Sequence, residues 1–379
     1  MIIHQPETKK ENGQFIVSSR IEYFGDNDMP NELCFGVDEE HASLVSSRSD
    51  IFLSTLVRVA RAMGEDIEVR GELSPQLLFG MREYLKVHAA WSGNYDIINI
   101  NASNLVPAKR TSNTSAASCN ISGGIDSFHT LWSQLPENEP VRELQVIYGI
   151  YGIGFSSPYQ NSFLKTTYVP RLKKMLKSLD VNLLVVESNA REFAHPDAWL
   201  PISTSRIAVP QLFSGLISTH FVPSSNTYQI LYPYGTHPLT DQLFSLESLR
   251  IFTHGSEFAR FEKLREMSTW VPFYDYLQVC NNLTGNFTND SVCMKCDHTK
   301  LMLKVLELDE KVSTFHRPFR PKSLVSRIIR DKDQYSQFTL IAKEARARGQ
   351  EYLIPFIWLS KLIYRLTSWI KPLLGYKFK

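Results

Sequence analysis

The chain lacks long hydrophobic runs: no uninterrupted apolar stretch among its 379 residues reaches the length that spans a membrane. Residues 1–13 are polar and lack the apolar segment of a signal peptide. Cysteine is scarce as well, and five cysteines in a chain of this length do not form a disulfide framework. Two of them, Cys34 and Cys119, stand alone and are expected to be core thiols. These absences predict a cytoplasmic protein with reduced thiols.

The chain also lacks a large net charge, but its charges are unevenly distributed. The formal net charge is +2, whereas residues 317–379 contain 14 Lys and Arg against 4 Asp and Glu, a net charge of +10. The remaining residues contain 27 Lys and Arg against 35 Asp and Glu, a net charge of −8. An acidic body with a basic tail predicts that the tail contacts something anionic.

Short strands and helices alternate in the first 110 residues, which predicts an N-terminal α/β domain over residues 1–110. Ser74 and Pro75 are typical of a helix start, with serine at the N-cap and proline at the first helical position. After a polar arm with one candidate strand near residues 15–17, strands are expected at 33–37, 67–69 and 95–100, and helices at 51–63 and 75–91.

The same alternation continues over residues 111–316 and predicts a doubly wound parallel sheet, in which ligands bind beyond the carboxyl ends of the strands. The residues that follow the strands would therefore share one ligand-binding edge, among them Tyr151-Gly152 and Ser188-Asn189. Strands are expected up to Ile121 and at 144–150, 181–186 and 228–232, helices at 128–134, 163–179 and 202–220, and a cysteine-rich loop at 280–298.

The most informative stretch is Ser122-Gly123-Gly124-Ile125-Asp126-Ser127, between a candidate strand and a candidate helix. Adjacent glycines permit positive φ angles, and successive N–H groups in such a turn form an anion-binding nest. The helix N-terminus and two serine hydroxyls would add donors to a phosphate. A carboxylate at Asp126 would repel phosphate unless a cation lies between them, which suggests Mg²⁺. The alternative is an ordinary strand-to-helix turn capped by Asp126.

This hexapeptide matches the SGGxDS signature of the PP-loop ATP pyrophosphatases, and the chain resembles that superfamily over roughly residues 115–310. The superfamily includes 7-cyano-7-deazaguanine synthase, asparagine synthetase, GMP synthetase and tRNA thiolases. Its motif differs from a Walker A loop, whose G-x-x-x-x-G-K-[ST] pattern does not occur in this sequence. The resemblance implies a Rossmann-like α/β fold and cleavage of ATP between its α- and β-phosphates.

The resemblance also implies roles for individual residues. Asp126 would hold Mg²⁺, Ser122 and Ser127 would act with it on the leaving pyrophosphate, and the backbone of residues 148–150 would receive the adenine. The adenylated substrate would be a carboxylate, amide or base carbonyl, and ammonia or another nucleophile would then displace the adenylate. Free ammonia or a partner would supply the nitrogen, because no cysteine or histidine stands out as an amidotransferase nucleophile. The implied ATP-binding set is Ser122, Gly123, Gly124, Ile125, Asp126 and Ser127.

Two further stretches supply candidate substrate contacts. His237 and Asp241 lie in a polar segment after an expected strand, so they would reach substrate or metal; the alternative is an ordinary loop with a surface histidine. Glu257, Arg260 and Lys263 recur at three-residue spacing on one face of a charged helix. We favour a solvated, salt-bridged face there, and the alternative is that Arg260 or Lys263 faces a phosphate.

The remaining cysteines suggest zinc. Cys293 and Cys296 form a C-x₂-C pair with Cys280 upstream, which is a recognisable zinc arrangement that needs a fourth ligand. The 7-cyano-7-deazaguanine synthases have a C-x₂-C-x₂-C run, and on that spacing Asp290 stands where they have a cysteine. His298 is a competing fourth ligand. The role would be structural, and the alternative is a loop without zinc that packing alone holds in place.

The basic tail, residues 317–379, consists of a Pro/Arg linker, a basic helix over 323–348 and an apolar helix over 353–374. In the last helix, apolar residues surround a narrow polar stripe, which is typical of a helix that lies on anionic lipid. The commoner use of such a pattern, which we favour, is packing on the protein's own core or on a second subunit. The stripe consists of Lys361, Arg365, Ser368 and Lys371.

Other functions remain open beside an adenylating enzyme. The chain could be a nucleotide-binding or membrane-docking module without turnover, or a tRNA-modifying enzyme whose tail binds RNA electrostatically. The joint presence of Asp126 and both loop serines favours an active enzyme. The tail's amphipathic order fits lipid or protein better than stacked bases, and a peripheral position at a membrane is compatible with the expected cytoplasmic location. The residues do not specify the acceptor.

Overall fold

The computed structural model describes residues 1–111, 115–155, 161–194, 201–233, 235–280, 289–326, 329 and 331–373. The chain divides into two compact units. The first, here called the sheet unit, comprises Met1–Ile121, Thr130–Ser224 and Leu231–His254. The second, here called the helical unit, comprises Ser122–His129, Ser225–Ile230 and Gly255–Lys379. This division differs from the one expected at residues 110 and 316.

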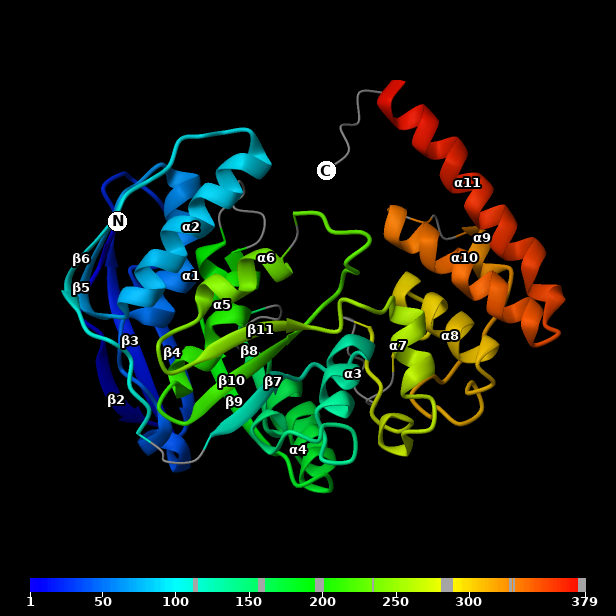
Figure 1. The fold of residues 1–379 in the computed structure, drawn as a ribbon, viewed down its shortest axis with the longest axis horizontal. Coiled ribbons are helices and arrows are strands. Elements are labelled where there is room, and N and C mark those ends of the chain that lie inside the picture. The colour runs from blue at the N-terminus through cyan, green and yellow to red at the C-terminus, as the bar shows by residue number, and fades with distance from the viewer. Residues whose placement is uncertain are drawn as a thin grey trace. The chain divides into compact units, whose positions relative to one another are not determined.

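A mixed, largely parallel sheet organises the sheet unit. In the described part of the chain it has eleven strands in the order β11-β10-β7-β8-β9-β4-β3-β1-β5-β6, with β2 paired to β3 (Figure 1). The strands are β1 (Ile2–Ile3), β2 (Glu7–Glu11), β3 (Gln14–Glu22), β4 (Glu32–Asp38), β5 (Ile67–Leu73), β6 (Ile100–Leu105), β7 (Ala116–Asn120), β8 (Val146–Ile153), β9 (Asn182–Ser188), β10 (Ile217–Pro223) and β11 (Arg250–His254). The expected α/β class is confirmed.

The antiparallel pairing of β4 with β9 joins the first strands of the chain to the later ones. Phe35 lies opposite Ser188 in this pair. The Ser188 hydroxyl donates to the Cys34 carbonyl at 2.7 Å, and the Cys34 N–H donates to Asn189 Oδ1 at 3.0 Å. These bonds join the strands of residues 1–110 and the later strands into one sheet. The expected N-terminal domain is therefore not a separate compact unit.

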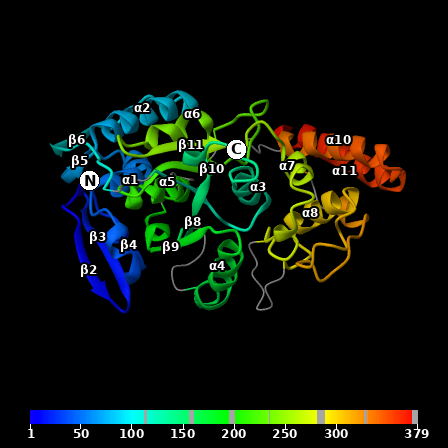
Figure 2. The same ribbon diagram turned by 60° about the horizontal axis from the view of Figure 1, so that its bottom comes forward.

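Helices cover the sheet with apolar faces. Ser74 caps α2 as predicted, since its side chain accepts the Leu77 N–H at 3.0 Å, and α1 buries residues from Ile51 to Ala60 against the core. In both views α1, α2 and α5 lie together, whereas α4 lies apart from them beside β9 (Figures 1 and 2). The bounds are α1 (Asp50–Met63), α2 (Pro75–Ser92), α4 (Val169–Lys177), α5 (Pro201–Ala208) and α6 (Pro238–Asp241).

Three predicted elements are wrong. The helix expected over 202–220 ends at Ala208, and the last four residues of that range begin β10, which pairs with both β7 and β11. Pairing on both sides outweighs local helix propensity for this β-branched and aromatic segment. Residues 228–232 form turns and not a strand, and the Tyr228 N–H donates to the Ser256 carbonyl at 2.8 Å. The strand expected at 95–100 lies farther along the chain, as β6.

The helical unit contains the last helices of the chain. α10 and α11 lie side by side in both views, and α10 also contacts α7 and α8 (Figures 1 and 2). The Phe338 ring of α10 packs 4.9 Å from the His298 ring of α8, so the basic tail is part of this unit. The helices are α7 (Arg260–Glu266), α8 (Met294–Val305), α9 (Ser323–Ser326), α10 (Lys332–Ala347) and α11 (Ile354–Leu373).

Candidate functional site

The loop 122–127 follows β7 and leads directly into α3 (Ile125–Ser133). Gly123 adopts a φ of 74°, in the left-handed region where a side chain would be strained. The Gly123 carbonyl accepts the Gln278 N–H at 2.8 Å, which anchors the turn from another segment. The predicted strand–turn–helix is confirmed, and the unbonded N–H groups that begin any helix adjoin the two glycines.

The two loop serines differ in exposure and in partners. Ser122 is exposed, whereas Ser127 is buried. The Ser127 hydroxyl donates to the Gly124 carbonyl at 3.0 Å and accepts the Ser122 N–H at 3.2 Å and the Ser122 hydroxyl at 3.1 Å. Ser127 therefore closes the loop, and Ser122 is the loop serine that lies at the surface.

Asp126 pairs with two cations of α7. The Arg260 Nη2 and Nε atoms lie 2.7 and 3.2 Å from Asp126 Oδ2, and Lys263 Nζ lies 3.3 Å from Oδ1. The side chains of Asp126, Arg260 and Lys263 are 19, 37 and 2% exposed. The solvated face that we favoured from the sequence is therefore wrong for Lys263, and both cations face the loop. Glu257 precedes the helix.

Burial and charge act together on this ion-pair cluster. Burial raises the pKa of the Asp126 carboxyl, but the charges of Arg260 and Lys263 outweigh it and lower the pKa to about 2. Burial lowers the pKa of the Lys263 amine, and the Asp126 charge opposes that change. Gly255 has a φ of 84°, and a Cβ at this residue would lie 3.3 Å from Lys263 Cε and Nζ. The carboxylate is ionised, and the lysine has little space to move.

A third cation, Lys295, interacts electrostatically with this ion-pair cluster and was not predicted from the sequence. Lys295 lies between two cysteines at the start of α8. Burial lowers the pKa of its amine, the Arg260 charge lowers it further, and the Asp126 charge raises it. Burial raises the pKa of the Asp333 carboxyl in α10, on which the Arg260 and Asp126 charges also act. The charges of Arg260 and Asp126 thus act on the pKa values of Lys295 and Asp333 as well.

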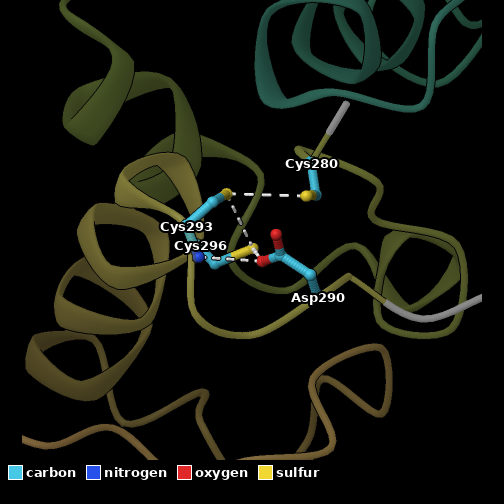
Figure 3. A group of neighbouring side chains, drawn as sticks. All are labelled: Cys280, Asp290, Cys293 and Cys296. Atoms are coloured by element: carbon cyan, nitrogen blue, oxygen red, sulfur yellow. Dashed lines mark hydrogen bonds between the residues drawn. The ribbon is translucent and has the colours of Figure 1, made fainter. Parts of the chain in front are cut away.

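The predicted metal ligands converge. Cys280, Asp290, Cys293 and Cys296 point toward one another, and their ligand atoms all lie within 4.8 Å (Figure 3). Cys293 Sγ is 3.5 Å from Cys280 Sγ and 3.4 Å from Cys296 Sγ, and Cys296 Sγ is 3.2 Å from Asp290 Oδ1. Ligands at about 2.0–2.3 Å from a tetrahedral zinc ion are separated by roughly 3.3–3.8 Å. The cluster can hold a metal such as zinc.

Asn289 positions this cluster and was not predicted from the sequence. Its side-chain oxygen accepts the N–H groups of Val279 and Cys280 at 2.8 and 3.0 Å. Its amide nitrogen donates to the carbonyls of Leu277 and Thr314 at 3.0 and 3.3 Å. Asn289 is fully buried, so these bonds replace water that the amide would otherwise bind. The sequence feature that could have pointed to Asn289 is its polar amide side chain directly before the candidate ligand Asp290.

His298, the alternative fourth ligand, is not in the cluster. Its ring packs edge-on against Phe338 instead. Cys34 and Cys119 also lie outside the cluster and are free thiols; Cys119 is buried, as predicted for a core thiol, whereas Cys34 is only half-buried. Burial raises the pKa of each of these two thiols.

His237 and Asp241 belong to the sheet unit, whereas the loop 122–127 belongs to the helical unit. His237 caps α6: its Nδ1 accepts the Leu239 N–H at 3.0 Å, and its ring packs 4.8 Å from the Trp91 ring. Asp241 is fully buried and accepts the His237 N–H at 2.9 Å and the Thr253 hydroxyl at 2.7 Å. These contacts are those of a structural cap.

The Asp241→Asn variant should remove a pH dependence of stability. Burial raises the pKa of Asp241 to about 7. The folded state therefore keeps a proton that the unfolded state releases near pH 4, and its stability falls as pH rises from about 4 to about 7. An asparagine can accept from His237 and donate to Thr253, so the variant should be more stable at pH 8, by on the order of a few kcal/mol. Thermal unfolding midpoints across this range measure the effect.

The exposed Asp26→Asn serves as the control, because it removes a carboxylate at the surface. If the unfolding midpoints of wild type and Asp241→Asn changed with pH in the same way, the raised pKa of Asp241 would be contradicted.

Parallel neighbours β7, β8 and β9 place their carboxyl ends at one sheet edge, as predicted. Ser188 and Asn189 at this edge bind the backbone of β4, so they join strands together. The prediction that Tyr151 and Gly152 follow the strand is wrong, because β8 extends to Ile153 and contains both; residues 148–150 of the same strand pair with β9.

No protein-family model, no curated protein and no solved structure matches the chain. Among the described residues, no helix combines the length and apolarity that a membrane crossing requires.

Proposed function

We propose that this chain is an ATP-dependent adenylating enzyme that converts ATP to AMP and pyrophosphate, similar to the PP-loop ATP pyrophosphatases and nearest in pattern to 7-cyano-7-deazaguanine synthase. The observation that carries the proposal is the pairing of the loop 122–127 with Arg260 and Lys263. A glycine turn, a helix start and two cations meet there, and polyphosphate is the ligand class that suits them. The sequence motif supplies the link to ATP.

In the proposed reaction, an oxygen of the acceptor attacks the α-phosphorus of ATP. The bond between this phosphorus and the bridging oxygen breaks, and pyrophosphate leaves with the electron pair. The loop N–H groups and Ser122 would bind the leaving group, while Arg260 and Lys263 would balance its charge. The acceptor is a carboxylate, amide or base carbonyl, and ammonia or another nucleophile displaces the adenylate.

Mg²⁺ would accompany ATP and neutralise charge that develops on the phosphates. Asp126 is its proposed ligand, but this carboxylate already pairs with Arg260 and Lys263. The Mg²⁺ role therefore requires that at least one of these ion pairs opens. If both ion pairs stay intact, Arg260 and Lys263, and not Mg²⁺, are the cations that would separate the Asp126 carboxylate from a phosphate.

The Cys₃Asp cluster would hold a structural Zn²⁺. Three thiolates and a carboxylate complete a tetrahedral shell, which leaves no position for a reacting water. The cluster is linked to the loop through Gln278: its N–H donates to the Gly123 carbonyl at 2.8 Å, and its side-chain amide donates to the Cys280 carbonyl at 3.2 Å. A bound metal would thus help to fix the glycine turn.

The products formed from Mg-ATP test the proposal. Wild type should produce AMP and pyrophosphate when a small-molecule cell extract and ammonium are added. The Ser122→Ala variant, which keeps the backbone donors, should lose about tenfold or more of this activity, and Asp126→Asn should lose nearly all of it. The exposed Ser92→Ala is the control. Formation of ADP and phosphate would contradict the mechanism, and ATP binding without cleavage would favour a non-catalytic module. If tRNA alone supports AMP formation, the enzyme modifies RNA.

A further inference from the structure

The outer face of α11 is apolar and exposed. One side of this helix packs within the helical unit, where Ile357 is fully buried and the Ser360 hydroxyl donates to the Leu324 carbonyl. The exposed apolar residues occupy the opposite side, at spacings that keep them on one face of a helix. They are Trp358, Leu359, Leu362 and Leu366, with exposed fractions of 61, 42, 41 and 55%.

Basic side chains run along one flank of this outer face. Lys361 Nζ donates to Thr339 Oγ1 of α10 and lies 4.2 Å from the Tyr335 ring centroid, and the Arg365 guanidinium lies 5.4 Å from the same centroid. The helical periodicity places three exposed cations of α10 on the same side as Thr339, whereas Asp333 and Glu344 lie on another side of that helix. These cations are Lys332, Lys343 and Arg346.

We propose that the outer face of α11 docks on an anionic lipid bilayer. The exposed side chains would enter the boundary between headgroups and acyl chains, with α11 parallel to the surface. The basic strip, Lys332, Lys343, Arg346, Lys361 and Arg365, would then contact the anionic headgroups. Charge complementarity favours this occupant, because residues 352–373 contain no Asp or Glu while a bilayer supplies both an apolar layer and negative charge.

The packing within the protein that we favoured for α11 is present on one side of the helix, and the proposal concerns the opposite side. Packing on the protein's own core accounts for only one side of the helix. The proposed docking is peripheral, with α11 lying along the surface of the bilayer. The proposed site is independent of the loop 122–127, and its test does not depend on ATP cleavage.

Flotation of the full-length protein with lipid vesicles tests the proposal. One vesicle type contains phosphatidylcholine alone, and the other contains equal parts of phosphatidylcholine and phosphatidylserine. Wild type should partition onto the anionic vesicles at least tenfold more strongly, and high salt should weaken this binding. Trp358→Glu should reduce it about tenfold or more, because it places a carboxylate in the apolar face. Lys343→Glu with Arg346→Glu should reduce it comparably and leave binding to phosphatidylcholine unchanged.

Val271→Glu is the matched control, since Val271 is 64% exposed in the same unit and lies away from α10 and α11 in the sequence. It should float as wild type does. Circular dichroism on each variant checks that the fold is retained. Equal flotation of wild type and Trp358→Glu would overturn the proposal. The proposal would also be overturned if wild type did not float with the vesicles but formed a dimer that Trp358→Glu converts to a monomer. That result would show that the outer face of α11 binds a second copy of the chain.

Discussion

Removal of a bound metal should destabilise the helical unit more than any single surface substitution. Cys296 is fully buried, and the four ligand atoms are close enough for one tetrahedral ion. Without the ion, three thiol groups and one carboxylate would remain packed together in a largely buried site. Structural zinc contributes about 10–16 kcal/mol to the folding of zinc-finger peptides, and a loss of only about 4 kcal/mol would lower the unfolding midpoint by roughly 10 °C or more.

The measurement combines metal analysis with thermal unfolding. Protein purified from zinc-supplemented cells should contain one zinc ion per chain, and a chelator should lower the unfolding midpoint. Cys296→Ser should lose the metal. Asp290→Asn should bind it roughly a hundredfold more weakly, and Asp290→Cys should retain it.

Two variants serve as controls for the metal site. Cys34→Ser changes a thiol outside the cluster, and His298→Ala removes the other candidate ligand. Both should keep the full metal content. Purified wild type without zinc, cobalt or another bound metal would show that packing alone holds this loop.

Neutralising Asp126 should cost more stability than neutralising Lys263, although the two residues form one ion pair. Asp126→Asn leaves Arg260 and Lys263 next to each other without their shared counter-charge, and the Lys263 side chain is only 2% exposed. Breaking such a buried pair from one side costs about 3–5 kcal/mol. Lys263→Met leaves Asp126 with Arg260 as its partner, so its cost should be smaller.

A double-mutant cycle measures this coupling. The free energies of unfolding of wild type, Asp126→Asn, Lys263→Met and the double variant are compared in urea at neutral pH. The double variant should be more stable than Asp126→Asn alone. Because the pKa of Asp126 is lowered to about 2, the stability from this cluster is present above pH 4 and should be lost as pH falls from about 4 to about 2. Additive effects of the two substitutions would contradict the coupling.

ATP binding by the same variants separates two roles of Asp126. If the carboxylate mainly holds Arg260 and Lys263, Asp126→Asn should bind ATP without Mg²⁺ at least as tightly as wild type. If it mainly binds Mg²⁺, the variant should lose the Mg²⁺-dependent part of the affinity.

The three cysteines of the cluster that could hold a metal could be predicted from the sequence because their spacing constrains a local loop. Asp290 could be added only through the resemblance, because it stands where the 7-cyano-7-deazaguanine synthases have a cysteine, three residues before Cys293. The supporting residues could not be predicted in this way. Asn289 acts on segments that are distant in sequence, near Leu277 and Thr314, and only the folded chain brings them together.

Lys263 and β10 show why two predictions from local sequence patterns were wrong. The spacing of Arg260 and Lys263 on a helix predicts a shared face, but it does not reveal that Asp126 covers that face. Residues 217–220, the start of β10, were included in the helix predicted over 202–220, and their strand structure depends on pairing with β7 and β11. In both cases the decisive contacts are long-range.

The pairing of β4 with β9 has a consequence for the order of folding. Phe35 must find Ser188 across more than a hundred and fifty intervening residues before the sheet is continuous. During synthesis, β3 and β4 emerge from the ribosome long before β9 does, so an edge of β4 stays unpaired during that interval. Contacts of such high sequence separation are formed slowly, and exposed strand edges are sites of aggregation. Refolding of this chain should therefore be slow and sensitive to protein concentration, with chaperones most useful before β9 has been made.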